Sequence, residues 1–304
     1  DYYIAGNEDT DLFEKIFLVD DIVEEICKPD KYFLIGEKGS GKTAYSVYMS
    51  KSDKINSFCS ISLVENTLYQ RFLNMKRQKA LELSSFKDVW INLIYLILAE
   101  KIRKEYGEAF FSSIKYKQLS KAIDVFYSDA FKPEFVNAFE FVDNASASIN
   151  SMMKQGLFST GTKASAETSQ KYVEQSFQIS LLKIRDGFEK AFMSVNLKKP
   201  TILFVDGIDA RPRDIDNEQY FECLVGLVNA VLEMNQSFLK EKQIKIMLLI
   251  RPDIMYKMPV HNMNQKLRNN SVLLNWVTSY RKYIDLKLFK IADDYFMKQQ
   301  DYSY

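Results

Sequence analysis

The sequence predicts an α/β fold in which a mostly parallel sheet is flanked by helices. Five short apolar runs of strand length alternate with segments of helical spacing, which is the pattern of such sheets. Three of the ten glycines fall between the first apolar run and the helix that follows it. A long helical stretch interrupts the alternation after the second run. We therefore expect an insertion between the second and third strands.

The amino-terminal part of the chain predicts two helices and two strands. Irregular chain precedes a short helix at Asp20–Cys27, and Pro29 ends that helix because proline does not continue one. Lys31–Ile35 is a short apolar and aromatic run suited to a buried strand. A helix follows Thr43, and Phe58–Val64 is the second predicted strand.

Three further strands are predicted after the long helical stretch. Thr201–Val205 and Ile244–Ile250 are largely apolar, as expected of strands that are buried on both faces. Ser271–Trp276 is a shorter run, and a closing helix follows it. All five strands are thus separated by helical segments.

These elements predict a core in two parts and an insertion. Residues 1–66 and 198–304 form the core with the sheet, and residues 67–197 form the helical insertion. Within the insertion, residues 144–170 are rich in Ser, Ala, Thr and Gly and poor in large apolar groups. This composition predicts a mobile loop.

Composition narrows the classes of function. The net charge of +1 over 304 residues gives no electrostatic reason to expect nucleic acid or an acidic membrane as the main partner. Three widely spaced cysteines fit a reducing compartment and predict a cytoplasmic protein. The single histidine excludes a metal site built on several imidazoles. The longest apolar stretch, Val89–Ala99, is about half the length that crosses a bilayer, so no membrane contact is expected.

The glycine cluster matches the phosphate-loop pattern G-x-x-x-x-G-K-[ST]. Phosphate oxygens must approach the backbone closely there, and the N–H groups of the next helix then point at the anion. Lys42 supplies a positive charge for the β- and γ-phosphates, in binding and in catalysis, and the Thr43 hydroxyl supplies a ligand to Mg²⁺. The alternative is a glycine-rich turn that matches by chance. The predicted nucleotide-binding residues are Gly36, Glu37, Lys38, Gly39, Ser40, Gly41, Lys42, Thr43 and Ala44.

Two acidic residues after the third predicted strand are candidates for the same site. Asp206 ends an apolar run, and a buried carboxylate there is naturally paired with a cation, so we expect it to help hold Mg²⁺. The alternative is an aspartate that opens a turn before Gly207. Asp209 is the candidate that orients or deprotonates water, although it could also be a plain loop acid. Glu65 is an alternative candidate for that role.

Arg251 is the candidate contact for the γ-phosphate. It follows the fourth predicted strand, which would neighbour the phosphate-loop strand in such a sheet, and its guanidinium can bind phosphate oxygens. The alternative is a structural ion pair with Asp206 or Asp253. Three other arginines are further candidates for a phosphate contact, from the loops after the third and fifth strands: Arg211, Arg213 and Arg281.

Four segments, GEKGSGKTA, FVDGIDARP, LLIRPDIM and NNSVLLNW, together resemble bacterial P-loop ATPases of the neighbourhood of the STAND and KAP NTPases, in the AAA+-like branch. The resemblance covers residues 10–65 and 200–290. It implies the strand order 5-1-4-3-2, binding of ATP and Mg²⁺ by Lys42, Thr43 and Asp206, and a sensor role for Arg251. Proteins of this neighbourhood are ATP-driven switches often linked to effector domains, including in antiphage defence.

The leading hypothesis is therefore an ATP-binding, slowly hydrolysing regulatory ATPase that acts as a nucleotide-dependent switch on an effector or within a homo-oligomer. Slow hydrolysis is expected because Gly207 stands where many ATPases have glutamate. One alternative is a non-hydrolysing scaffold with ATP as a structural ligand. Another is a small-molecule kinase, although residues 144–170 contain none of the arginines that such enzymes place over an acceptor.

Overall fold

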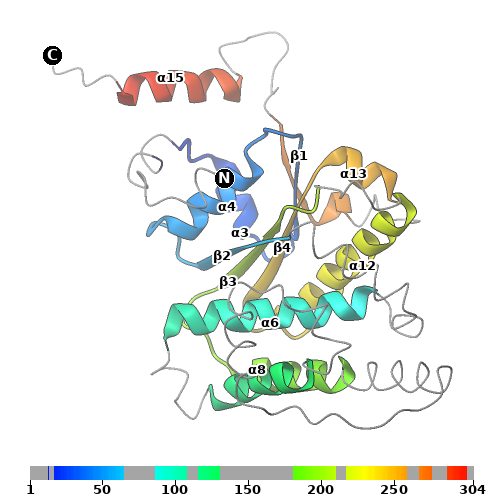
Figure 1. Cartoon of the computed structure of the whole chain (residues 1–304). Helices are drawn as coiled ribbons and strands as arrows, with labels where there is room; N and C mark the ends of the chain where they lie inside the picture. Colours follow the sequence, from blue (N-terminus) through cyan, green and yellow to red (C-terminus); the bar gives the residue numbers. More distant parts are fainter. Residues whose placement is uncertain are drawn as a thin grey trace, which may run out of the picture. The chain divides into compact units, whose positions relative to one another are not determined.

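The computed structural model describes eight stretches of the chain, which Figure 1 draws in colour. They divide into two compact units. The described residues are 13, 17–64, 86–107, 116–130, 181–209, 217–258, 267–275 and 286–299. The first unit, here called the sheet unit, comprises residues 1–63, 198–209 and 243–304. The second, the helical unit, comprises residues 64–197 and 210–242. The predicted loop at 144–170 lies outside the described residues.

The sheet unit contains one five-stranded sheet in which every strand pair is parallel. Its strands are β1 Phe33–Gly36, β2 Phe58–Leu63, β3 Thr201–Asp206, β4 Ile244–Ile250 and β5 Ser271–Leu274. Counted from the β2 edge, the order is β2-β3-β4-β1-β5. Counted from the β5 edge, the same series is 5-1-4-3-2, as the family resemblance implies. The predicted α/β class with a parallel sheet and flanking helices is confirmed.

The helices of the sheet unit include α3 Asp21–Cys27, α4 Lys42–Lys51, α13 Pro252–Lys257 and α15 Lys287–Gln299. Asp20 caps α3, because its Oδ1 accepts a hydrogen bond from the backbone N–H of Ile22 at 3.2 Å. Pro252 is the first residue of α13, where its missing N–H costs no helical hydrogen bond. Local chemistry thus sets where these helices begin.

The core of the sheet unit forms where α3 and α4 cover the sheet. All residues of β1, β3 and β4 are buried, as expected of central parallel strands with helices on their faces. Each fully buried large aliphatic or aromatic side chain contributes about 1.5–3 kcal/mol to folding. The cluster includes Val23, Ile26, Leu34, Val47, Tyr48, Met49, Ile202, Phe204, Met247, Leu249 and Val272.

Lys245 of β4 is a charged residue within this buried layer, with 7% of its surface exposed. Its ammonium donates hydrogen bonds to the carbonyl of Ile26 and, at 2.8 Å, to that of Lys28, at the end of α3. A cation at this position satisfies carbonyls that a helix end leaves unpaired. Burial lowers the pKa of Lys245 to about 8, although the nearby Cys27 and Cys59 oppose this shift.

Between β2 and β3 in the sequence, the helical unit contains α6 Phe86–Tyr106, α8 Lys117–Ala130 and a further helix at residues 181–194. It also contains α12 Asn217–Gln236, which follows β3 in the sequence. The described part of the predicted insertion is therefore helical. Among the described residues, no helix has the length and apolar character needed to cross a bilayer.

Close packing of α6 against α12 holds the helical unit together. The indole N–H of Trp90 donates a hydrogen bond to the carbonyl of Cys223 at 3.1 Å. A Cβ at Gly226 of α12 would lie 2.6 Å from the Cβ of Phe86, so the helices approach at a point where only glycine fits. Arg185 and Lys87 both pair with Glu233, at 2.7 and 2.8 Å.

Candidate functional site

The glycine cluster forms the connection between β1 and α4. Gly39 and Gly41 have φ angles of 81° and 89°, in the left-handed region that glycine adopts without strain. Gly36 is needed for a different reason, because a Cβ there would overlap the Ser40 hydroxyl and lie 3.0 Å from the Cβ of Leu274. The three glycines therefore meet two distinct steric demands of one tight loop.

The amino terminus of α4 is open to an anion. Gly41 is its N-cap residue and makes no side-chain capping bond, so no side chain of the cap accepts from the first N–H groups of the helix. The Ser40 hydroxyl beside it is 3% exposed as a residue and has no hydrogen-bond partner within the described chain. The start of a helix without a side-chain cap and a buried hydroxyl without a described partner together make a fitting environment for phosphate oxygens.

Lys42 extends back over this loop. Its Nζ donates hydrogen bonds to the carbonyls of Gly36 at 2.8 Å and Glu37 at 3.1 Å, and the residue is 7% exposed. Burial lowers the pKa of Lys42, the charges of Asp209 and Asp206 raise it, and Arg251 lowers it again. The ammonium thus lies among the charged residues that the sequence assigned to one site.

Thr43 and Asp206 meet directly, although 163 positions separate them in the sequence. The Thr43 hydroxyl donates to Asp206 Oδ2 at 2.6 Å, and the N–H of Gly207 donates to Oδ1 at 2.7 Å. Burial raises the pKa of Asp206, the bonds from Thr43 and Gly207 lower it, and the nearby Asp209 raises it. The meeting follows from the fold, because β1 and β3 are parallel and their carboxyl ends share one edge of the sheet.

The Thr43–Asp206 pair has the chemistry of a magnesium site. Mg²⁺ prefers hard oxygen ligands and is commonly held by one or two carboxylates together with substrate phosphates and water. Among the described residues, no group of three or more histidine, cysteine or acidic side chains could hold a metal by itself. These two oxygen donors fit an ion that takes its other ligands from a bound phosphate and from water.

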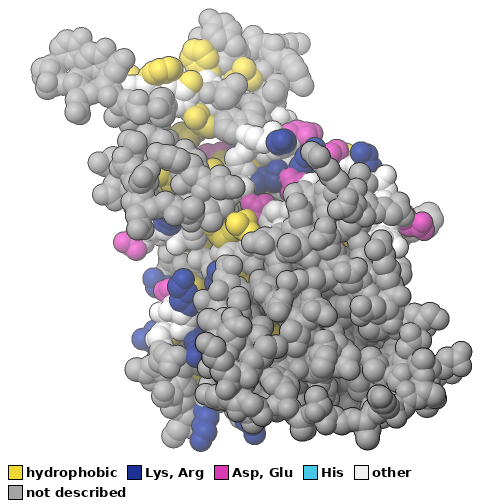
Figure 2. All heavy atoms as spheres, viewed as in Figure 1, with side chains coloured by type: hydrophobic (Ala, Val, Ile, Leu, Met, Phe, Trp, Pro, Cys, Tyr) yellow, Lys and Arg dark blue, Asp and Glu magenta, His cyan; other side chains and the backbone are white. Residues whose placement is uncertain are grey.

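Arg251 and Asp209 complete the charged surroundings of the loop. Arg251 follows β4 and forms a two-point ion pair with Asp253, with Nε–Oδ1 at 2.9 Å and Nη2–Oδ2 at 2.8 Å. This pair is one of the two structural alternatives left open by the sequence. Asp209 is half-buried, and its charge acts on both Lys42 and Asp206. Figure 2 shows positive and negative side chains next to one another in the region of β1 and α13.

The remaining predicted residues either lie in the loop and on α4 or fall outside the described part of the chain. Glu37, Lys38 and Gly39 are exposed at the tip of the loop, and Ala44 packs against the core cluster from α4. Four candidates lie outside the described part of the chain: Glu65, Arg211, Arg213 and Arg281.

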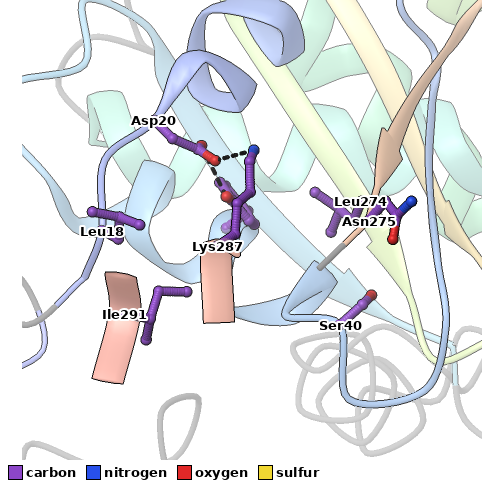
Figure 3. Close-up of a pocket in the computed structure, with 8 residues that line it drawn as sticks. Leu18, Asp20, Ser40, Leu274, Asn275, Lys287 and Ile291 are labelled. Carbon is purple, nitrogen blue, oxygen red and sulfur yellow. Dashed lines mark hydrogen bonds and ion pairs between the residues drawn. The ribbon is translucent and has the colours of Figure 1, made fainter. Parts of the chain in front are cut away.

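A pocket beside the loop was not predicted. It is small and open to solvent, and Ser40 forms part of its wall (Figure 3). Its lining comes from several elements of the sheet unit: Leu18, Asp20, Ser40, Tyr45, Leu274, Asn275, Lys287 and Ile291. The helix-capping aspartate at position 20 could have drawn attention to this region, but nothing local in the sequence points to Lys287.

Comparisons with family models, with curated proteins and with solved structures found no match to this chain. The resemblance to STAND- and KAP-like ATPases therefore stays a prediction.

Proposed function

We propose that the sheet unit is a P-loop ATPase core that binds Mg²⁺ and ATP at residues 36–44 and acts as a slowly hydrolysing regulatory switch. The contact between Thr43 and Asp206 is the observation that supports this most strongly. It joins the residue after Lys42 to the acid that ends β3, beside a helix terminus with no side-chain cap. A chance glycine turn has no need of this second acidic partner.

The residues of the site have distinct parts in this proposal. The N–H groups at the start of α4 and the Lys42 ammonium bind phosphate oxygens, and Thr43 and Asp206 hold the metal. Mg²⁺ supplies neutralisation of the charge on the phosphates. Lys42 now bonds two neutral carbonyls. A phosphate oxyanion attracts the ammonium more strongly than a carbonyl does, because the bond then joins two opposite charges.

Asp209 and Arg251 are assigned to hydrolysis. Asp209 orients the attacking water, and its position three residues beyond Asp206 accounts for a slow rate, because Gly207 offers no carboxylate. Arg251 contributes to catalysis only when Asp253 releases it from the ion pair. Asp253→Asn is therefore expected to raise the hydrolysis rate, since it removes the competing negative charge. The partner of the switch, an effector or a second copy, stays a prediction.

Phosphate release from ATP under single-turnover conditions tests this function. Wild-type protein should release phosphate slowly, Asp209→Asn should slow the release by about tenfold or more, and Thr43→Ala should weaken its dependence on Mg²⁺. Lys38→Ala is the matched control, because this lysine lies in the same loop but is exposed. Bound ATP with no phosphate released over hours would instead assign the protein to non-hydrolysing scaffolds.

A further inference from the structure

We propose that the edge of the sheet at which the strands begin is a basic surface that binds the phosphate backbone of a nucleic-acid duplex, whatever its base sequence. Parallel strands all begin at one edge, so the segments that lead into them gather there. The proposed ATP site lies at the other edge, where the strands end. The seven residues of β4 separate the two edges by about 20 Å. A duplex at the first edge would therefore leave the ATP site accessible, and its binding does not depend on the proposed function.

The segments that lead into four of the strands carry most of the charge at this edge. They all belong to the sheet unit and are here called the basic edge: residues 28–32, 51–57, 198–200 and 267–270. They contain seven Lys and Arg and two Asp, a net charge of +5 in a chain whose net charge is +1. The small total for the chain thus conceals a local excess of positive charge. The cations are Lys28, Lys31, Lys51, Lys54, Lys198, Lys199 and Arg268, of which all but the partly exposed Lys31 are exposed.

Hydrogen bonds join the segments at the β2 side of the basic edge. The N–H of Phe58 donates to the carbonyl of Pro200 at 2.7 Å, which links the entries of β2 and β3. The N–H of Thr201 donates to the carbonyl of Gln243 at 2.8 Å, which links β3 to β4. Figure 2 shows Lys and Arg side chains at the surface on the left of the view, where β2 and β3 begin in Figure 1.

The β5 side of the basic edge is joined in the same way. The Lys245 ammonium of β4 donates to the carbonyl of Lys28 at 2.8 Å, at the segment that leads into β1. The Lys31 ammonium donates to the carbonyl of Asn269 at 3.0 Å, which links the entries of β1 and β5. The basic edge is therefore one continuous surface that follows the strand order from β2 to β5.

The shape of the basic edge fits a linear polyanion. Neighbouring strands lie about 4.8 Å apart, so the five strands place their entries along a row of about 20 Å. A nucleic-acid duplex carries about one negative charge per 1.7 Å of its axis, so a length equal to this row presents several phosphates. A single small anion would contact only one part of the row.

The side chains of the basic edge suit phosphates better than other anionic surfaces. Six of its seven cations are lysines, which bind phosphates as point charges, whereas the fork of arginine matches carboxylates. The structure describes the whole basic edge, and no large apolar side chain is exposed there that could insert into a membrane. The lack of exposed aromatic rings also removes the base stacking that holds single strands. Contact through the backbone of a duplex is the mode that fits.

The excess of charge is greatest where β2 and β3 begin. Residues 51–57 and 198–200 contain four lysines and one acid, Asp53. At the β1 side, Lys28 forms an exposed ion pair with Glu25, and Asp30 lies two residues away. Exposed ion pairs contribute little, so a phosphate can take the place of Glu25, but the attraction is weaker there. Lysines of the β2–β3 corner are therefore the residues to substitute.

The test measures binding of the full chain to a labelled DNA duplex of mixed sequence by fluorescence anisotropy, between about 50 and 200 mM salt and without ATP. Wild-type protein should bind with a Kd of about 1–100 µM at physiological salt, and log K against log salt should have a slope of about −4. The double variant Lys54→Gln, Lys199→Gln should bind about tenfold or more weakly at low salt, with a slope less steep by about 2. A duplex of another sequence should bind equally well.

The double variant Lys257→Gln, Lys290→Gln is the matched control. It removes the same charge from two exposed lysines of α13 and α15, outside the basic edge, so it should bind the duplex as wild-type protein does. Since no ATP is present, a failure of the proposed ATP site would leave these results unchanged.

Four results would overturn the inference. Absence of duplex binding at the lowest salt would reject the surface. An equal loss of affinity in both double variants would show that only net charge matters. If polyglutamate displaced the duplex as well as unlabelled DNA of the same charge did, the surface would fit an acidic protein segment instead. Binding to phosphatidylserine vesicles without binding to the duplex would assign it to a membrane.

Discussion

Replacing Ser40 with alanine should raise the stability of the ligand-free protein and lower its affinity for Mg-ATP. Ser40 is 3% exposed, and its hydroxyl has no partner among the described residues. A buried polar group without a hydrogen bond costs about 1–3 kcal/mol. Removing the hydroxyl should recover about 1 kcal/mol of this, because the methyl group that remains fills most of the same space.

Two other serines of the sheet unit are matched controls. Ser60 of β2 also has a buried hydroxyl without a described partner, so Ser60→Ala should stabilise similarly but leave the affinity unchanged. Ser46 of α4 is fully buried, and its hydroxyl donates to the carbonyl of Thr43 at 2.8 Å. Ser46→Ala should therefore lose about 1 kcal/mol of stability, the usual net value of one hydrogen bond.

Thermal unfolding without nucleotide and calorimetry with Mg-ATP measure the two effects. A change of 1 kcal/mol moves the melting temperature by about 2–4 °C for a unit of 150–250 residues. Ser40→Ala should weaken ATP binding by about tenfold, since a bond to a charged group is worth about 1.5–3 kcal/mol. If Ser40→Ala destabilised the protein as Ser46→Ala does, or left the affinity for ATP unchanged, the hydroxyl would not be held open for a phosphate.

Three further predictions concern buried groups. Burial raises the pKa of the Asp206 carboxyl, so this carboxyl holds its proton more tightly in the folded protein than in the unfolded chain. The free energy of unfolding should therefore fall as the pH rises above the ordinary pKa of an aspartate. Asp206→Asn should abolish this fall in urea unfolding curves, and it should also remove the effect of Mg²⁺ on ATP binding. The pKa of Lys245 is lowered to about 8, so stability should rise between about pH 8 and the ordinary value of 10.5, and Lys245→Met should flatten this rise. Gly226→Ala should cost about 1–3 kcal/mol of unfolding free energy through overlap with Phe86, whereas Gly187→Ala, in open space on a helix, should be neutral or stabilise by up to about 1 kcal/mol.

The geometry of the glycine loop was predictable because its signal is local. Eight consecutive residues specify a strand end, two left-handed glycines, a lysine and a threonine, and no distant part of the chain is needed to recognise them. Asp206 was predictable for a related reason, because an acid at the end of a buried apolar run marks the edge of the sheet where Thr43 also lies.

Contacts between distant side chains were not predictable in the same way. Lys287 pairs with Asp20, which is 267 positions away in the sequence, and no local pattern around either residue indicates the other as its partner. The partner of Arg251 was left open between two acids, because both are close in sequence or in the sheet, and only side-chain geometry selects Asp253. The need for glycine at position 226 likewise arises only because Phe86 of α6 packs against α12 at that point.

Calorimetric titration of wild-type protein, Lys42→Ala and Lys38→Ala with Mg-ATP tests the central claim most directly. Wild-type protein and Lys38→Ala should bind with the same affinity, and Lys42→Ala should show no binding, because only Lys42 has its ammonium buried within the loop. Unchanged affinity in Lys42→Ala, or no binding by wild-type protein, would contradict the account.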